Sequence, residues 1–395
     1  MASQEILREE PSRASFINDP KVRSLVFQAV VVVVLGALVW WIVQNTIDNL
    51  QRLHIASGFG FLRGRAGFDI SDSAIAYTSD STYGRAIVVG FINTLIVAAA
   101  GIVTATIIGF IVGVGRLSRN WLIRKICMVY VEVFRNIPPL LVIFFWYSGV
   151  LSVLPAPRDS YHLPFGSFLN QRGFYFPRAM WGEGSWLILV AFLVGIAMAW
   201  FVARKAHQRQ MATGQQFPVF WTSLALVVGL PVLAYALSGF PLSFDFPKQS
   251  TFNLTGGFQV KPEFLSLYLA LSCYTAAFIA EIVRAGIMGV SKGQTEAAGA
   301  LGVRPGSILR LVVVPQAMRI VIPPLTSQYL NLTKNSSLAI AIGYPDLTAT
   351  AGTVLNQTGQ AIECVLIMMV VYLVLSLVTS AVMNVVNARM ALVER

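Results

Sequence analysis

Charged residues are scarce in this chain, which has 29 Lys and Arg and 18 Asp and Glu among its 395 residues. Only 12% of the residues are charged, whereas 56% are hydrophobic, and the mean hydropathy is +0.68. Soluble globular domains have about twice that charged fraction, because their surfaces face water. The composition therefore excludes a single water-soluble domain and predicts a protein that crosses a membrane several times.

Residues for catalytic or metal chemistry are equally few. The chain has three cysteines, far apart in apolar runs and without metal-ligand spacing. The segment Gly289–Gly293 matches the G-x-S-x-G pattern of a hydrolase, but that chemistry needs a strand before Ser291 and a histidine after it. An apolar span precedes Ser291 and all three histidines lie upstream of it. The sequence therefore predicts a protein that is not an enzyme, with no catalytic residue and no metal site.

The pattern G-x-x-x-x-G-K-[ST], which cradles the phosphates of ATP, is also absent from the sequence. We therefore expect no cofactor bound by this chain, and energy for any transport must come from a partner or from an ion gradient. Two hypotheses follow. One is a permease that borrows an ATPase, and the alternative is an ion-coupled secondary transporter or a channel. A secondary transporter is expected to show two similar halves with interrupted helices, and no such duplication is evident.

Eight apolar runs are long enough to cross a hydrocarbon core of about 30 Å. They cover residues 25–43, 86–115, 126–154, 186–203, 218–237, 264–288, 320–342 and 363–386. The net charge of +11 is spread over loops without interleaved aromatic residues, so membrane lipid is the expected partner of these bases, not nucleic acid. With the amino terminus inside, eight crossings place the basic joints after residues 115 and 203 and both termini in the cytoplasm.

The segment Ser291–Pro305 predicts a short helix between two longer ones. Ser291 and Gln294 fit a capping box, in which each side chain bonds a backbone N–H at the helix start. Gly302 suits the left-handed conformation that ends a helix, and Pro305 prevents simple continuation. Within the helix, we expect Ala297, Ala298 and Leu301 to form a small apolar face beside Glu296, suited to docking into a groove of another protein.

The same segment resembles the EAA loop of ABC-importer permeases, through Glu296-Ala297-Ala298, Gly302 and Val312–Pro315. Further segments resemble the histidine and glutamine permeases, and the whole is most like the general L-amino-acid permease subunits. These segments are Glu281–Ile287, Pro315–Arg319, Leu332–Leu338 and, more weakly, Tyr130–Leu141.

The resemblance implies an all-helical type I importer core, built from the second, third, sixth, seventh and eighth spans, with an inserted helix pair. It implies a cytoplasmic tail (1–24), a first anchor (25–43) and a periplasmic loop (44–85). The first part of the core (86–154), an insertion (155–262) and the second part of the core (263–395) follow, and the last of these contains the coupling loop (289–315).

The resemblance also implies partners and roles. An importer of this family takes up L-amino acids across the bacterial inner membrane. It combines a second permease subunit, paralogous or identical, with two ATP-binding subunits that hydrolyse ATP and a periplasmic amino-acid-binding protein. The coupling residues would be Glu296, Ala297, Ala298, Leu301 and Gly302.

Charges within membrane spans are expensive and need a reason. Glu132 with Arg135, and Glu281 with Arg284, are three residues apart and predict two ion pairs near the cytoplasmic side, either structural or part of an inner gate. A polar run in the seventh span either lines the substrate pathway, where its lysine would meet a carboxylate, or joins helices. This run contains Asn331, Lys334, Asn335, Ser336 and Ser337.

Overall fold

The computed structural model describes residues 20–52, 57–250 and 253–390. The described part contains seven helices long and apolar enough to cross a membrane, and eight spans if one bent helix pair is counted as a single crossing. These eight segments coincide with the eight apolar runs, which confirms the expected membrane architecture. The predicted tail at 1–24 lies outside the described residues, apart from the positions from Pro20 onward, which begin a helix.

Four long helices and one short helix form the central bundle. They are α2 (Tyr83–Gly115), α7 (Pro262–Met288), α10 (Val314–Asn335), α11 (Leu347–Thr358) and α12 (Ala361–Met390). Helices α2 and α7 pack closely because α2 presents glycines at the contact: a Cβ on Gly109 would lie 2.6 Å from Cβ of Ile279. Small residues at helix contacts within a membrane allow such a close approach of two backbones.

The segment that corresponds to the third apolar run is sharply bent. Helix α3 (Trp121–Asn136) is followed by α4 (Pro139–Phe144), which runs into a π-helical turn, η3 (Phe145–Leu151), and the two halves meet at a bend of 112°. Pro138 and Pro139 lie at the bend, where they cannot donate backbone hydrogen bonds and push the preceding residue out of the helical region. At the other end, the Asn120 side chain caps α3 by accepting from the amides of Leu122 and Ile123.

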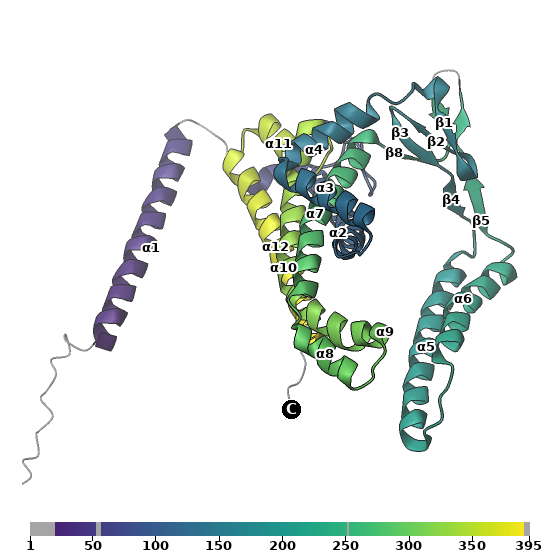
Figure 1. Ribbon diagram of the computed structural model, residues 1–395. Coiled ribbons are helices and arrows are strands. Elements are labelled where there is room, and N and C mark those ends of the chain that lie inside the picture. Colours follow the sequence, from purple (N-terminus) through teal and green to yellow (C-terminus); the bar gives the residue numbers. More distant parts are fainter. Residues whose placement is uncertain (1–19, 53–56, 251–252, 391–395) are drawn as a thin grey trace, which may run out of the picture.

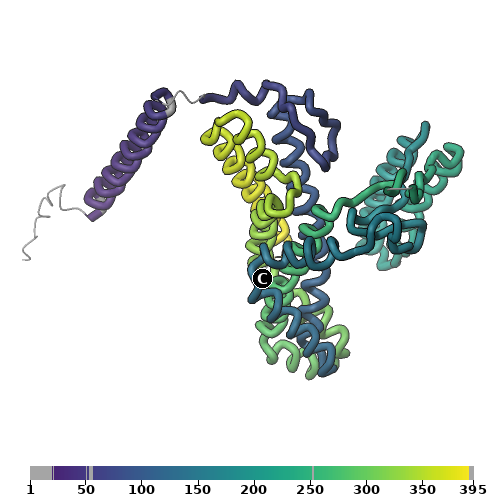
Figure 2. Tube along the Cα trace, turned by 90° about the horizontal axis from the view of Figure 1, so that it is seen from above, coloured from purple at the N-terminus to yellow at the C-terminus, as the bar shows by residue number. Residues whose placement is uncertain are grey.

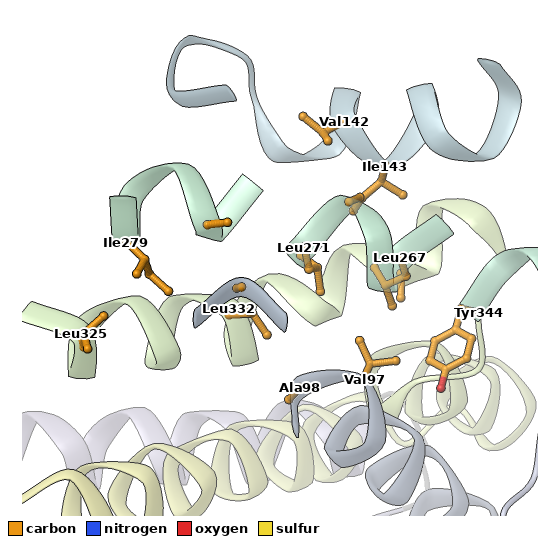
Figure 3. Close-up of a cluster of buried hydrophobic side chains, with 14 of the residues drawn as sticks. Val97, Ala98, Val142, Ile143, Leu267, Leu271, Ile279, Leu325, Leu332 and Tyr344 are labelled. Carbon is orange, nitrogen blue, oxygen red and sulfur yellow. The ribbon is translucent and has the colours of Figure 1, made fainter. Parts of the chain in front are cut away.

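The bundle closes around one apolar core, to which helices distant in sequence contribute. Figure 3 shows Val97 of α2, Ile143 of α4, Leu271 of α7 and Leu332 of α10 converging, with Tyr344 at one edge. All five side chains are buried. Since lipid is as apolar as these side chains, tight packing rather than water exclusion stabilises this core.

Residues 155–262 form a lobe of short strands and a helix hairpin. The sheet of four strands has the order β1-β2-β3-β8, and two strand pairs, β4 with β5 and β6 with β7, accompany it; all pairings are antiparallel. The strands span Tyr161–Leu163, Ser167–Asn170, Gly173–Phe176, Arg178–Trp181, Leu242–Asp245, Lys248–Gln249, Leu254–Thr255 and Phe258–Val260. The sequence did not predict these strands, because each is too short to show an alternating pattern.

The expected inserted helix pair is α5 (Trp186–Thr213) and α6 (Val219–Leu237). The two helices pack on each other, and Figure 1 shows the hairpin apart from the central bundle. Helix α1 (Pro20–Arg52) also lies apart from the bundle, and Figure 2 shows it on the opposite side from the hairpin. Helix α1 extends beyond the predicted anchor at 25–43 on both sides, and the polar residues after Val43 continue it to Arg52.

The bundle has two distinct ends (Figure 1). At one end lie the strands and α11, together with the 3-10 helices η2 (Phe59–Arg63) and η7 (Ser336–Ile342). At the other end lie α8 (Lys292–Ala300) and α9 (Pro305–Ile308), and the joint between α5 and α6 points the same way. This arrangement agrees with the predicted alternation of sides, and we call these the outer and inner ends. Two further 3-10 turns, η4 (Pro157–Asp159) and η5 (Pro164–Gly166), lie in the strand lobe.

Candidate functional site

The inner end carries the predicted short helix, with one of its two expected end signals. Gly302 adopts the left-handed conformation at φ 75°, and its amide donates to the Gly299 carbonyl at 2.9 Å, as predicted. The capping box was wrong: the Ser291 side chain accepts no capping hydrogen bond, and only its backbone carbonyl contacts the Gln294 amide, at 3.1 Å. Pro305 starts α9, so α8 is a separate helix of nine residues.

The apolar face of α8 differs from the prediction. Ala298 is only 8% exposed and packs against Ile308 and Val313, so it anchors α8 to the chain that follows. Leu301 is 83% exposed, and Glu296 and Ala297 are exposed as well. Ala298 therefore cannot contribute to a docking face, because Ile308 and Val313 already cover it. Of the predicted coupling residues, Glu296, Ala297, Leu301 and Gly302 remain exposed.

The connection from α8 to α10 is irregular. The turn η6 (Leu309–Val313) is π-helical and leads into α10 immediately before Pro315. Pro315 has no amide N–H to donate, which interrupts the regular helix at this point. Through Ala298, Ile308 and Val313, the short helix is thus packed directly against the start of α10.

A cluster of charges lies where α2 and α7 end at the inner side. Arg284 Nε donates to both Glu281 carboxylate oxygens, at 3.1 and 3.2 Å, which confirms the predicted pair. Arg116 also donates to Glu281, so one carboxylate joins two arginines and ties α2 to α7.

The predicted pair of Glu132 and Arg135 was wrong. Among the described residues, neither side chain forms an ion pair, and the Arg135 guanidinium lies 5.7 Å from the ring centre of Phe278. A cation over an aromatic ring is an alternative that sequence spacing does not reveal.

The polar run of the seventh span ends α10. Ser336 is buried and its hydroxyl donates to the Thr333 carbonyl at 2.7 Å, while Ser337 donates to the Lys334 carbonyl at 2.8 Å. Asn331 and Lys334 are exposed, and Asn335 is half-buried. Helix α10 continues through Pro323 and Pro324 to Asn335.

Comparison with known proteins places this architecture in a family. The family described as "Binding-protein-dependent transport system inner membrane component" matches residues 188–392. The chain is 64% identical, over 96% of its length and 95% of the relative's, to "General L-amino acid transport system permease protein AapQ" of Rhizobium johnstonii.

The chain belongs to this family. It is a permease, a multi-span component of an inner membrane, and the resemblance to ABC-importer permeases is confirmed. The permease is also 42% identical, over 98% of its length and the relative's whole length, to "Glutamate/glutamine/aspartate/asparagine transport system permease protein BztB" of Rhodobacter capsulatus. Among solved structures it is similar to "Crystal structure of an amino acid ABC transporter with histidines", at 20% identity and a TM-score of 0.47, covering 78% of this chain and 95% of that one.

Sequence reasoning missed residues at both ends of the permease. At the inner end it noted Arg116 only as one base of a cytoplasmic joint, although Arg116 lies immediately after a membrane helix, where a carboxylate partner is a reasonable expectation. At the outer end it missed Asn93, a buried amide whose nitrogen donates to the carbonyls of Asp72, at 2.8 Å, and Pro345, at 2.9 Å. A buried asparagine within an apolar span was the available signal, because such a group must find hydrogen-bond partners.

No described residues form a cluster of three or more His, Cys, Asp or Glu that could hold a metal ion. Asp346 is fully buried at the start of α11, where its carboxylate accepts from the Ala349 amide at 2.8 Å and from Tyr372 at 3.4 Å. Burial raises the pKa of Asp346 to about 6, although these hydrogen bonds favour the charged form. The carboxyl therefore titrates close to neutral pH.

Proposed function

We propose that this permease imports L-amino acids of broad specificity, delivered by a periplasmic binding protein and driven by ATP that partner subunits hydrolyse. The exposed face of α8 carries the ATP-driven part of the proposal, because a short helix at the inner end with Leu301 83% exposed is a docking surface for another protein. The amino-acid part rests on relatives: one similar over 96% of this chain is named for general L-amino acid transport, and another for glutamate, glutamine, aspartate and asparagine.

The proposed assembly contains two ATP-binding subunits and a second permease subunit, either identical or paralogous. In this arrangement α8 faces the cytoplasm of a bacterial cell, and both termini lie on the same side as α8. ATP binds to the partner subunits, and this chain contributes no nucleotide site.

The packing around α8 supports a route for the motion. A shift of α8 reaches α10 directly, because Ala298 packs against Ile308 and Val313 just before α10 begins. Helix α10 in turn packs on α7 through Val321 and Gly286. Glu281, held by Arg116 and Arg284, ties α7 to α2 at the same end. We place the inner gate at this cluster, because separating α2 from α7 requires the Arg116–Glu281 pair to break.

The polar run of α10 is the proposed lining of the substrate pathway. Lys334 and Asn331 are exposed on the helix near its outer end, and Lys334 has no carboxylate within ion-pair distance among the described residues. A lysine in such a position can meet the carboxylate of a passing amino acid. Ser336 and Ser337 bond to their own helix, so they contribute shape to the pathway more than hydrogen bonds to a substrate.

The central experiment is uptake of labelled amino acids into proteoliposomes that contain this chain with its co-purified partners. The binding protein, the ATPase subunits and internal ATP are each omitted in turn. We expect uptake only when all three are present. Uptake by this chain alone under a proton or sodium gradient would overturn the proposal in favour of an ion-coupled carrier.

Substitution of Gly302 tests the docking role of α8. Gly302→Asp adds a charged side chain at an exposed, left-handed position, and we expect ATP-driven uptake to fall at least tenfold while membrane insertion is retained. Gly302→Asn is the matched control, because asparagine tolerates this backbone conformation and adds a side chain of the same size without the charge. Normal uptake by Gly302→Asp would count against docking at this surface.

A further inference from the structure

A cavity of about 560 Å³ lies at the outer end of the permease, between the central bundle and the strand lobe. One wall comes from Asp72 and its neighbours in the loop before α2, and another from Asn93 and Ile96 of α2 itself. The strand lobe supplies Arg178 of β4 and Phe258 of β8. Ligand pockets in proteins commonly have volumes of about 300–1,000 Å³, so this cavity is large enough to hold a small metabolite.

The cavity is held in shape by specific hydrogen bonds. Lys261, just before α7, lies 3.5 Å from the Asp72 carboxylate and donates to the Ser71 carbonyl. From the opposite side, Asn93 donates to the Asp72 carbonyl at 2.8 Å. The buried Tyr344 packs beside Phe264, with 5.9 Å between ring centres. The loop that carries Asp72 is therefore fixed to both α2 and α7, and the cavity is preformed.

Two opposite charges of this cavity have unused hydrogen-bonding capacity. Asp72 Oδ2 is buried and accepts no hydrogen bond from any described residue. Burial raises the pKa of Asp72, while the Lys261 ammonium opposes that shift and favours the carboxylate. Arg178 forms no ion pair with a described residue, although Asp245 is its cross-strand neighbour; that carboxylate accepts from the Gly257 amide at 3.0 Å.

We propose that this cavity binds a free L-amino acid by its backbone groups, with Asp72 accepting from the α-ammonium and Arg178 donating to the α-carboxylate. A buried carboxylate oxygen without a donor is costly, and an ammonium supplies three donors. A guanidinium matches a carboxylate with two parallel hydrogen bonds. Asp72 and Arg178 carry opposite charges, so together they fit a ligand that carries both an ammonium and a carboxylate.

This inference rests on the proposed function and assigns a role to the strand lobe. Recognition of the two groups common to all amino acids leaves the variable side chain facing Ile96 and Phe258, in a cavity with spare volume. That arrangement selects for the amino-acid backbone and tolerates many side chains. Because Arg178 belongs to β4, the site is complete only when the lobe is present, so residues 155–262 supply half of an entry site for substrate.

The test is equilibrium binding of tritiated L-glutamine and L-leucine to the full chain in lipid nanodiscs, without the binding protein. We expect Asp72→Asn and Arg178→Gln each to weaken binding at least tenfold. The controls are Asp69→Asn, in the same loop but outside the cavity, and Arg172→Gln, exposed in the same lobe; both are expected to bind as the wild type does. Unchanged binding in both cavity variants would overturn the site.

Ligand analogues give a second, independent readout on the unmodified protein. L-leucinamide lacks the carboxylate and N-acetyl-L-leucine lacks the ammonium. The reference concentration is the one at which unlabelled L-leucine halves the bound label. At ten times that concentration, neither analogue is expected to displace labelled L-leucine. If both analogues compete as strongly as L-leucine does, recognition of the backbone groups is overturned. Arg178→Lys is expected to bind between wild type and Arg178→Gln, and thermal unfolding of each variant shows that it is folded.

The outcomes separate this site from the proposed function. Uptake that requires ATP and the binding protein, with no direct binding of amino acid to the chain, overturns the cavity and leaves the importer proposal standing. Direct binding that depends on Asp72 and Arg178, in a chain that shows no ATP-driven uptake, supports the cavity and overturns the importer proposal.

Discussion

At the scale of single residues, Glu281 shows how one carboxylate serves two helices. It accepts from Arg284 on its own helix and from Arg116 at the end of α2, and all three side chains are at least two-thirds buried. Only the Glu281–Arg284 pair follows from spacing, because the Arg116–Glu281 contact joins residues 165 positions apart. The carboxylate is therefore the member of this cluster whose loss leaves most charge unpaired.

We predict that Glu281→Gln lowers the free energy of unfolding by about 1–3 kcal/mol, because it leaves two partly buried guanidinium groups without a carboxylate. Arg284→Gln is expected to cost less, since Arg116 still pairs with Glu281. Glu132→Gln is the matched control: Glu132 is exposed and forms no ion pair with a described residue, so its loss should change stability by less than about 0.5 kcal/mol. Thermal unfolding in detergent measures all three, and equal effects of Glu281→Gln and Glu132→Gln would contradict the cluster.

Asp346 predicts a dependence of stability on pH. Its pKa is about 6 when folded, against about 3.9 in an unfolded chain. Between these values the folded state binds more protons than the unfolded state, so the free energy of unfolding falls as the pH rises from about 4 to about 6. Acidification from pH 7 to pH 5 should therefore stabilise the wild type by about 1 kcal/mol through this group.

Asp346→Asn should lose this contribution while retaining the helix cap, because asparagine caps helices as well as aspartate does. The measurement is the difference in unfolding temperature between pH 7 and pH 5 for both proteins in the same detergent. All other titrating groups are shared, so they cancel in the comparison. Parallel pH profiles would show that Asp346 does not titrate in this range.

At the scale of elements, the contact between α7 and α10 depends on a glycine. A Cβ on Gly286 would overlap Cγ2 of Val321 and lie 3.2 Å from the Ala317 carbonyl. This close approach packs α7, the helix before α8, directly against α10, the helix after it. The two helices that flank α8 are thus packed on each other, and α8 lies at the end of a single packed unit.

We predict that Gly286→Ala destabilises the permease by about 1–3 kcal/mol through overpacking. Val321→Ala in the same chain removes the overlapping methyl group and leaves the Val321 Cβ 3.6 Å from the new methyl group, an ordinary contact. The double variant should therefore be more stable than the sum of the single effects predicts. Gly352→Ala in α11 is the control, because a Cβ there meets no atom within 4 Å. Strict additivity of Gly286→Ala and Val321→Ala would rule out the overlap.

At the scale of the whole molecule, the α5–α6 hairpin is a separable pair of crossings. Strands β4 and β5 are paired as far as Trp181 and Leu242, which lie opposite each other. The two ends of the hairpin are therefore close together at the outer end. Removal of both helices preserves the sidedness of everything that follows, whereas removal of one would invert it. The hairpin can therefore be deleted without moving α8 to the other side of the membrane.

We predict that replacing residues 182–241 by Asn-Gly yields a folded permease. The two-residue turn fits the antiparallel pair of Trp181 and Leu242, and β4 keeps Arg178 at the outer cavity. A fluorescent protein fused after Arg395 should report a cytoplasmic carboxyl terminus in both the parent and this variant. Deletion of α6 alone is the control that should move the fusion outside and abolish fluorescence. A cytoplasmic signal from that control would refute the proposed topology.

The sequence by itself determined the eight apolar segments, the short helix that precedes α10 and the left-handed end of α8 at Gly302. These features are local: a span is recognised by its length of apolar residues, and Gly302 by a backbone conformation that few other residues adopt. The sequence could not show that Gly109 of α2 packs against Ile279 of α7.

Only the tertiary structure decided which distant groups meet. It paired Arg116 with Glu281, gave Glu132 no ion pair with a described residue, turned Ala298 inward, and brought Asp72 and Arg178 to one cavity. Each of these outcomes depends on the relative rotation and depth of helices, and the periodic pattern of one helix carries no information about its neighbour's depth. The physical reason is that the length of an apolar segment determines whether a helix can cross the membrane. Packing between side chains determines the position and rotation of that helix relative to its neighbours.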